Sequence, residues 1–339
     1  MHHDFEKISK TKELSYLDNI KGTELGKDVE LVEGMVGLAP NFDNQYDRID
    51  VKKIKAFEFS DPFSVSIWIS PGKRPAEGTS MTIIGNSSIK GELYKGWDLH
   101  IDYAGQLSAR LISVLPNNYM HIKTPETIPL NEWTHVLMTY DGSSKARGLH
   151  VYLNGKETPH TIEYDNLFKT IIPRNKGNLI IGKSPRGQSG DNGIFIGKID
   201  QLSIYDTDIL PLQAAQLYEQ SKLGKEPVVY RPNDPTYLEM SEALAGLQKE
   251  KLEVITPIKE TMVMEEMFPR RKTYILERGE YNKPGMEVQR GVPDKILGFS
   301  AEYSKDRFGL SKWLFDKNNP LTARVAVNRY WQMIFGRGL

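Results

Sequence analysis

The sequence predicts a mainly β protein, in which a two-sheet antiparallel sandwich is followed by α-helices. The first observation behind this prediction is that residues 35–221 hold about ten short apolar runs, each closed by a Gly, Asn or Asp turn signal. The second is that no helical pattern alternates with these runs, which disfavours a parallel βαβ arrangement. The third is a change of pattern around Pro227, after which helical periodicity dominates.

The strands of the sandwich are expected in chain order after an N-terminal segment, residues 1–34, that is partly irregular. The upstream runs are DRIDV (47–51), SVSIWIS (64–70), TIIGN (82–86), GWDLHID (96–102), QLSARLISV (106–114) and YMHIKT (119–124). The four clearest runs follow them: NEWTHVLMTYDG (131–142), LHVYLNG (149–155), NLIIGK (178–183) and GKIDQLSIYD (197–206). This series predicts a sandwich domain over residues 35–225.

A Pro-rich linker and a helix are expected over residues 226–261. The segment EPVVYRPNDP holds three prolines, and Asp234 followed by Pro235 is a typical helix start. One stripe of apolar residues at near-heptad spacing then supports the helix: Tyr237, Met240, Leu244, Leu247 and Val254.

A second, helical domain is expected to begin at about residue 262 and to be incomplete at Leu339. Residues 270–293 are punctuated by Gly and Pro and are predicted to be irregular. Two helices follow, over 306–316 and 319–336, and the second is opened by Asn319 as cap and Pro320 in its first turn.

The composition excludes several classes of function. Lys and Arg total 44, as do Asp and Glu, so the net charge of zero argues against a nucleic-acid partner held by electrostatics. The absence of cysteine excludes disulfides, thiolate zinc sites, iron–sulfur clusters and covalently attached haem within this chain. No apolar run is long enough to span a membrane, and the N-terminus does not resemble a signal peptide. We therefore expect either a cytosolic protein or a piece of a longer exported one.

The order of segments from Phe42 to Tyr205 resembles the laminin-G-like, concanavalin A-like jelly roll of bacterial surface and polysaccharide-associated proteins. The matching pieces are NFDNQYDRIDV, DPFSVSIWISP, EWTHVLMTYDG, LHVYLNGK, NLIIGK and GKIDQLSIYD, and the tail LPLQAAQLYEQ resembles the helix that usually follows. The resemblance implies a two-sheet jelly-roll sandwich and a binding function.

A second resemblance covers roughly residues 262–339. The run NPLTARVAVNRYWQMIFGRGL in particular looks like the opening of a C-terminal domain of unknown function in large planctomycete-type proteins associated with cytochrome c domains. This family implies an extracytoplasmic location, periplasmic, at the cell surface or secreted. It also implies neighbouring domains of the same protein as partners, with any haem outside these residues.

A structural calcium ion is the cofactor that the sandwich resemblance suggests. Asp200 shares its parity with Leu202 and Ile204, so its carboxylate is expected to point toward the core and to need a partner. In similar sandwiches this partner is often calcium near the N-terminal strand, which makes Asp43, Asn44 and Asp47 candidate oxygen ligands. The alternative is that Asp200 only accepts backbone N–H bonds or pairs with Lys or Arg.

A polar sheet face is the candidate ligand site. If Trp97, Leu99 and Ile101 face the core, the period of two turns the intervening residues outward. The resulting candidates are Asp98, His100, Asp102, Arg110, Tyr119 and His121, with the loop SPRGQSGDNG (184–193) as a rim. Such side chains can bind sugar hydroxyls by hydrogen bonding and stacking. The alternative is an ordinary solvated face.

Motifs of the common catalytic sites are missing from this sequence. The closely spaced carboxylates of related glucanases are replaced by EYDNLF (163–168), which offers only Glu163 and Asp165. The seven histidines show no HExxH spacing, and no nucleophile elbow or P-loop occurs. Arg324 and Asn328 form an i,i+4 pair beside Trp331, for which helix capping and interhelical bonding are the favoured explanation.

The leading hypothesis is therefore a non-catalytic module that binds a carbohydrate, most simply a polysaccharide, within a larger exported or surface protein. The alternative is a structural or protein-interaction domain that positions a redox or hydrolytic domain outside this chain. The sequence predicts neither a nucleic-acid partner nor a membrane span.

Overall fold

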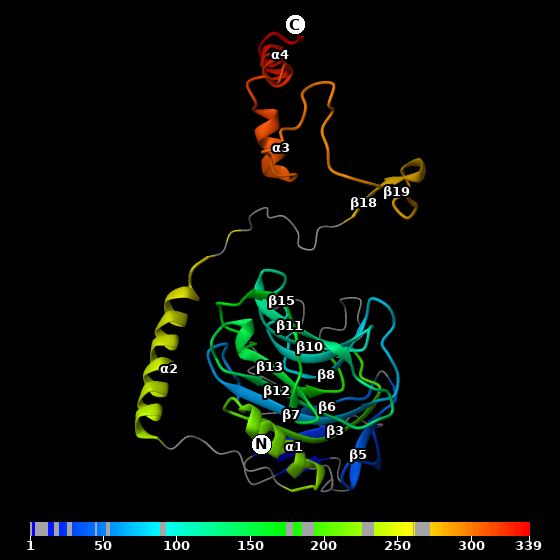
Figure 1. Ribbon diagram of the computed structural model, residues 1–339, viewed down its shortest axis with the longest axis vertical. Helices are drawn as coiled ribbons and strands as arrows, with labels where there is room; N and C mark the ends of the chain where they lie inside the picture. The colour runs from blue at the N-terminus through cyan, green and yellow to red at the C-terminus, as the bar shows by residue number, and fades with distance from the viewer. Residues whose placement is uncertain are drawn as a thin grey trace. The chain divides into compact units, whose positions relative to one another are not determined.

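The fold was established with a computed structural model. It describes residues 2–3, 13–16, 20–25, 29–44, 46–51, 55–88, 93–173, 179–184, 193–225, 234–259, 261 and 272–339. The chain divides into two compact units, Met1–Ile258 and Lys259–Leu339. The first unit is a sandwich of two antiparallel sheets, which confirms the predicted fold class (Figure 1).

Sheet A has eight strands and contains most of the segments from the second half of the sandwich. Its order is β14 (Lys156–Glu157), β13 (Leu149–Leu153), β12 (Thr134–Tyr140), β7 (Phe63–Pro71), β17 (Gly197–Tyr205), β5 (Leu38–Phe42) and β4 (Glu30–Glu33). The short β1 (His2–His3) also pairs with β17. The last strand of the sandwich therefore lies at the centre of this sheet.

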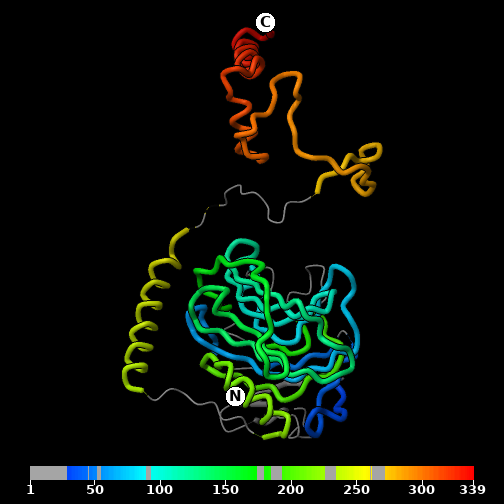
Figure 2. The backbone as a smooth tube through the Cα atoms, viewed as in Figure 1, coloured from blue at the N-terminus to red at the C-terminus, as the bar shows by residue number. Residues whose placement is uncertain are grey.

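Sheet B has nine strands and forms the other layer, which Figure 2 traces in the same view. Its order is β15 (Thr161–Asn166), β11 (Asn118–Thr127), β10 (Gln106–Val114), β9 (Gly96–Asp102), β8 (Ser80–Gly85), β16 (Leu179–Ile181), β6 (Ile49–Val51), β3 (Ile20–Leu25) and β2 (Glu13–Tyr16). All ten predicted runs are strands of the two sheets. Strands β2, β3 and β4 lie within residues 1–34, where the sequence predicts a partly irregular segment.

The core lies between the sheets and is built from alternate residues of each strand. On β7 the side chains of Phe63, Val65, Ile67 and Ile69 are fully buried, and on β9 those of Trp97, Leu99 and Ile101 are buried in the same cluster. This period of two is what a sheet with one core-facing side requires. It fixes which face of each sheet is turned outward.

The outer face of sheet A is covered by helix α1 (Pro211–Lys222), which confirms the predicted helix after β17. Ala214 and Leu217 of the helix pack on Leu137 and Tyr152 of the sheet. Trp68 Nε1 donates a hydrogen bond of 3.0 Å to Ser221 Oγ at the end of the helix. This face is therefore closed by the chain itself.

Helix α2 (Pro235–Ile255) belongs to the first unit and begins as predicted at Asp234, whose side chain accepts from Tyr237 N. The predicted apolar stripe is exposed on this helix. The contacts with the sandwich come from other positions, since Gln248 Nε2 donates to Gly142 O and Leu252 packs against the core.

The second unit combines a β-hairpin with two helices. Strands β18 (Thr273–Leu276) and β19 (Pro284–Val288) pair within residues 270–293, where the sequence predicts an irregular segment. Helices α3 (Arg307–Leu314) and α4 (Thr322–Phe335) agree with the two predicted helices. Asn319 Oδ1 accepts from Leu321 N and Thr322 N, but α4 begins only at Thr322, with Leu321 as its N-cap, so Asn319 and Pro320 lie before the helix rather than at its cap and first turn. No helix among the described residues is long and apolar enough to cross a membrane.

Candidate functional site

The polar side chains predicted to share one face meet on the outer side of sheet B. Because Trp97, Leu99 and Ile101 lie in the core, Asp98 and His100 lie on the opposite face. The register places Asp98 opposite Arg110, and Arg110 opposite His121. Residues that are opposite each other in neighbouring strands project from the same side of the sheet. The structure thus brings the side chains of four strands into one row, which ends at β15.

A buried charged group occupies the β9 and β10 part of this row. Arg110 Nε donates to Asp98 Oδ1 at 2.9 Å, and Arg110 Nη2 donates to Asp98 Oδ2 at 3.4 Å. His100 Nδ1 lies 2.9 Å from Asp98 Oδ1, and Ser87 Oγ donates to Asp98 Oδ2 at 3.1 Å. Asp98 is 1% exposed and His100 is 5% exposed. This part is therefore not an ordinary solvated face, because the Asp98 carboxylate is enclosed by the side chains of Arg110, His100 and Ser87.

His121 lies beside the charged group and is held neutral. Burial above all, and then the neighbouring His100, Arg110 and Lys123, lower its pKa to about 3. The rings of His100 and His121 are 6.1 Å apart. His121 Nε2 is enclosed and has no hydrogen-bond partner among the residues that the structure describes. A neutral imidazole has one nitrogen that donates and one that accepts, so this atom can pair with a ligand only if the side chains that enclose it move aside.

Two tyrosines stack next to His121 at the edge of the sheet. The rings of Tyr119 and Tyr164 are 4.3 Å apart and nearly parallel, at 12°. Both are partly exposed. Burial and the neighbouring Tyr164 raise the pKa of Tyr119, so its hydroxyl stays protonated. Tyr164 was missed from the sequence although its place between Glu163 and Asp165 fits the alternation of a strand.

The rim of this face is only partly described. Asp102 pairs with Lys123, whose Nζ lies 2.5 Å from Asp102 Oδ2. The predicted rim loop 184–193 is represented by its two ends, since residues 185–192 lie outside the described residues. Gly193 O accepts from Thr82 N, which brings one end of the loop to β8.

Three of the four predicted calcium ligands share one turn. Asp47 Oδ2 accepts from Asp43 N at 2.8 Å and from Asn44 N at 3.2 Å. Asn44 Oδ1 accepts from Tyr46 N, and its amide donates to Asp43 Oδ1. Asp47 Oδ1 is enclosed without a hydrogen-bond partner. The turn therefore holds one buried carboxylate oxygen that none of its described backbone groups uses.

Asp200 is buried as predicted but points to the other side of sheet A. A β-bulge lies between Asp200 and Ser203, and Asp200 is opposite Trp68, whose side chain contacts α1. Leu202 and Ile204 remain in the core because the extra residue of the bulge reverses the alternation between them and Asp200. The prediction that Asp200 shares their parity was wrong.

The carboxylate of Asp200 is held by backbone N–H groups. Its Oδ2 accepts from Met35 N at 2.8 Å and Val36 N at 3.1 Å, and its Oδ1 accepts from Gln201 N at 2.8 Å. Among the described residues no group of three or more His, Asp or Glu side chains is arranged to hold a metal ion. The four predicted ligands therefore do not surround one point.

The carboxylates of EYDNLF lie apart from the polar row. Asp165 is opposite Met120, so it projects from the other side of β15 than Tyr164. Asp165 Oδ1 accepts from Ala146 N at 2.9 Å, and Glu163 Oε1 accepts from Thr161 Oγ1 at 2.9 Å. In the second unit, Asn328 Oδ1 accepts from Leu339 N, which ties the residues after α4 back to the side of the helix.

Comparison with known protein families identifies both parts of the chain. The model described as the concanavalin A-like lectin/glucanases superfamily, of laminin G type, matches residues 43–215, just over half of the chain. A second model, described as a protein of unknown function (DUF1553), matches residues 306–339. No curated protein sequence matches the chain.

Several solved structures are similar to the sandwich at low sequence identity. The botulinum neurotoxin serotype G binding domain has 15% identity and a TM-score of 0.46, covering 60% of this chain and 47% of that one. The binding domain of Paraclostridial mosquitocidal protein 1 has 18% identity and a TM-score of 0.42, covering 59% and 47%. A heptameric SAP-like pentraxin from Limulus polyphemus has 17% identity and a TM-score of 0.37, covering 52% and 80%. The chain spans about half the length of the two toxin domains.

Proposed function

Because the chain belongs to the concanavalin A-like lectin/glucanases superfamily through residues 43–215, we propose that its sandwich is a module that binds carbohydrate. The binding surface in this proposal is the outer face of sheet B. It extends from the charged group at Asp98 and Arg110 to the edge strand β15. A polysaccharide is the preferred ligand, since the row crosses several neighbouring strands.

One observation carries this proposal: an enclosed imidazole nitrogen without a partner lies beside a partly exposed pair of stacked tyrosines. Tyr119 and Tyr164 supply flat apolar faces, and His121 Nε2 supplies a polar contact once the side chains that enclose it move aside. A sugar ring presents both hydroxyl groups and an apolar C–H face, so it matches both kinds of contact. Arg110 adds a donor whose position is fixed by Asp98.

The experiment is calorimetry of the whole chain against a panel of soluble plant and algal polysaccharides, with calcium present. We expect saturable binding to at least one of them and about a tenfold weaker affinity for Tyr164→Ala. Tyr281→Ala is the matched control, because Tyr281 is 90% exposed and belongs to the second unit. A lack of binding across the panel would refute the proposal. If Tyr164→Ala and its control bind polysaccharide equally well, the site does not lie on this face.

A structural calcium ion is a second part of the proposal, restricted to the turn 43–47. The enclosed Asp47 Oδ1 supports it, since calcium prefers carboxylate and carbonyl oxygens. Asp200 does not fit this set, because its carboxylate is held by three N–H groups. Added calcium should raise the melting temperature and chelation should lower it. Asp47→Asn should abolish the difference while Asp200→Asn keeps it, and a melting temperature indifferent to calcium would end this part of the proposal.

An extracytoplasmic location completes the proposal. A module that binds external polysaccharide must reach it, and the family match supports this placement. Fractionation of cells that express the natural gene would test it, with a purely cytosolic signal as the contrary result.

If sugar binding fails, the remaining candidate is a domain that positions another domain, for which α2 provides contacts through Gln248 and Leu252.

A further inference from the structure

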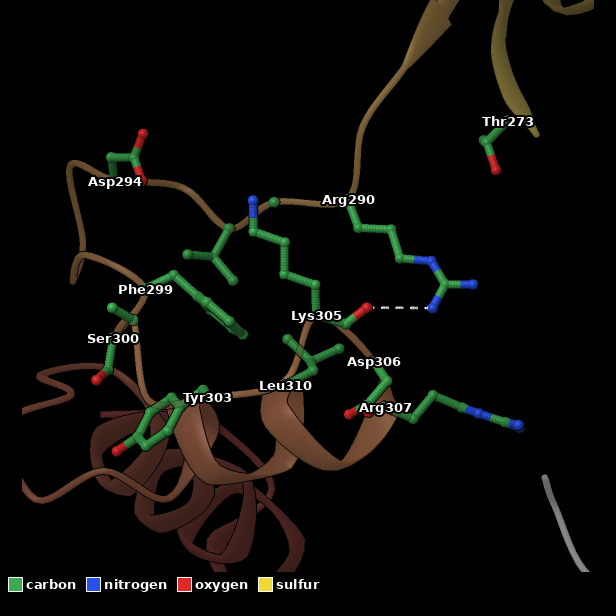
Figure 3. Close-up of a pocket in the computed structure, with 13 residues that line it drawn as sticks. Thr273, Arg290, Asp294, Phe299, Ser300, Tyr303, Lys305, Asp306, Arg307 and Leu310 are labelled. Atoms are coloured by element: carbon green, nitrogen blue, oxygen red, sulfur yellow. Dashed lines mark hydrogen bonds between the residues drawn. The ribbon is translucent and has the colours of Figure 1, made fainter. Parts of the chain in front are cut away.

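Two further clusters of titratable side chains lie outside the polar face of sheet B, and they differ in whether their members converge. One lines a hollow of about 1050 Å³ in the second unit (Figure 3). There the Lys305 ammonium and the Arg307 guanidinium lie on different sides, and Arg290 Nη1 donates to Lys305 O at 3.3 Å. The cations of this hollow therefore do not surround a single point.

The other cluster lies at the edge of sheet A and contains two histidines. His150 is on β13, Glu157 is on β14, and His160 directly precedes β15. Glu157 is opposite Tyr152, so it projects from the same face of sheet A as Tyr152 and His150. The imidazole rings of His150 and His160 are 5.9 Å apart and nearly perpendicular, at 88°. The turn from β13 to β15 thus brings the two histidines together.

Backbone contacts fix the segment that carries His160. Thr158 N donates to Val151 O at 2.9 Å, which extends the pairing of β14 with β13. Thr158 is buried, and His160 follows it by two positions. The place of His160 beside His150 is therefore set by the edge of the sheet.

Each imidazole already has a partner for one of its nitrogens. His150 Nδ1 lies 2.8 Å from Glu157 Oε1. A carboxylate only accepts hydrogen bonds, so Nδ1 carries the hydrogen and Nε2 keeps the lone pair. Burial and the neighbouring His150 lower the pKa of His160, while a hydrogen bond to the backbone of Thr158 raises it in part. This bond occupies one nitrogen of His160, and the lowered pKa favours a neutral ring whose other nitrogen carries a lone pair.

The separation of the two rings suits a shared metal ion. Imidazole nitrogens bind Zn²⁺ at about 2.0–2.1 Å, which places the centres of two rings on one tetrahedral ion about 5–6 Å apart. The rings of His150 and His160 fall within this range. Histidines that bind metal ions commonly donate their other N–H to a carboxylate or a backbone carbonyl. The side chains of His150 and Glu157 are 36% and 45% exposed, so an ion from solvent can reach them.

We propose that His150 and His160 bind one divalent transition-metal ion, Zn²⁺ or Cu²⁺, with Glu157 as a positioning residue for His150. Water supplies the remaining ligands, because no set of three His, Asp or Glu side chains in the described part of the chain is arranged for an ion. Imidazole suits zinc and copper, whereas calcium prefers oxygen ligands, so this site differs from the turn 43–47. The site is also independent of the carbohydrate site on sheet B, and either proposal can fail alone.

Calorimetric titration of the whole chain with zinc chloride tests the proposal. The parent protein carries His2→Gln with His3→Gln, which removes the adjacent N-terminal histidines as competing ligands. We expect saturable binding of one ion per chain, and an affinity about tenfold weaker or less in His150→Gln and in His160→Gln. Equal zinc affinities in the parent and in His150→Gln with His160→Gln would overturn the proposal.

The positioning role of Glu157 is tested separately. Glu157→Leu removes the acceptor of His150 Nδ1 and should weaken zinc binding about tenfold, whereas Glu157→Gln keeps an acceptor oxygen and should lose less. Glu126→Leu is the matched control, because it removes an exposed glutamate from β11 and should leave zinc affinity unchanged. Equal losses in Glu157→Leu and Glu126→Leu would contradict this role.

Pulsed electron paramagnetic resonance of bound Cu²⁺ gives a readout that a merely structural role of the histidines would not change. The spectrum should show the remote nitrogens of coordinated imidazole in the parent protein and lose them in His150→Gln with His160→Gln. The melting temperature of this variant without metal verifies that the sandwich is folded. A copper spectrum of the parent without imidazole nitrogen would overturn the proposal, whatever the variants do.

Discussion

The two outer faces of the sandwich differ in what covers them. On sheet A, the outward side chains of Trp68, Leu137 and Tyr152 are buried under α1. On sheet B, the outward row runs from the buried Asp98 to the partly exposed Tyr164. The residue type on the outward positions of a strand therefore indicates whether the chain closes that face itself.

One buried histidine lies on each outer face, and the two differ in what lowers their pKa. His135 lies on the outer face of sheet A, where burial alone lowers its pKa to about 3. Its Nε2 lies 2.8 Å from Ser66 Oγ. His121 on sheet B has its pKa lowered to about 3 by burial and by nearby cations. One imidazole is neutral because a helix covers it, and the other is neutral beside a surface that can meet a ligand.

The largest effect is expected where the sheet B face contains a buried charge pair. Asp98→Asn leaves the partly buried guanidinium of Arg110 without its carboxylate, which should cost about 3–5 kcal/mol of unfolding free energy. Urea denaturation and calorimetry of each variant measure this loss of unfolding free energy. Asp50→Asn is the control, because the Arg48–Asp50 pair is more exposed and should cost less than about 1 kcal/mol. Similar losses of unfolding free energy in the two variants would contradict the description of Asp98 and Arg110 as a buried ion pair.

A somewhat smaller effect is expected on the closed face. Leu217→Ala creates a cavity between α1 and sheet A and should cost about 3 kcal/mol, without changing affinity for polysaccharide. Leu212→Ala on the same helix is the control, because Leu212 is 75% exposed and should change stability by less than about 0.5 kcal/mol. Thermal unfolding compares the two. A change in sugar affinity in Leu217→Ala would show that the faces are coupled.

The smallest effect is the loss of stability in mild acid. His121 and His135 both have folded pKa values of about 3, below the ordinary 6.5, so the unfolded chain takes up protons first. Their stabilisation is complete above pH 6.5 and declines as the pH falls from 6.5 toward 3. The decline should be about 1.4 kcal/mol per pH unit for each histidine, so each one loses about 2 kcal/mol between pH 6.5 and 5, the smallest effect of a single residue among the three.

Denaturation curves across this pH range, compared between variants, test the assignment. His135→Asn and His121→Asn should each remove about half of the slope, whatever they do to stability at neutral pH. His150→Asn is the control, since His150 is exposed beside Glu157. A slope that persists in both buried variants would assign the acid sensitivity to other groups.

The local pattern predicted the strands and the direction of their side chains but not their coverage. The period of two placed Asp98 and His100 opposite Trp97 and Leu99, as the structure has them. Their burial accompanies contacts between neighbouring segments, such as the bond from Ser87 to Asp98, which alternation within one strand does not reveal. The same alternation could have indicated Tyr164, but β15 is too polar to be recognised as a strand.

Irregular backbone accounts for the error at Asp200. A bulge cannot be read from alternation, since it changes the parity that alternation assumes. Gln201 takes a positive φ of 48° within this bulge, which a sequence without glycine there does not suggest. Residues 30–33 and 38–42 were also missed as strands, because Pro40 and the short run lengths weaken their β pattern.

The central place of β17 has a consequence for how the protein is made. β7 lies between β12 and β17, so one of its edges stays unpaired until residues 197–205 have been synthesised. During translation the nascent chain must keep this apolar strand from other chains, because unpaired edges promote aggregation. We expect folding to be slow, since closing sheet A joins segments far apart along the chain. If translation pauses before residue 197, β17 is missing and sheet A cannot be completed.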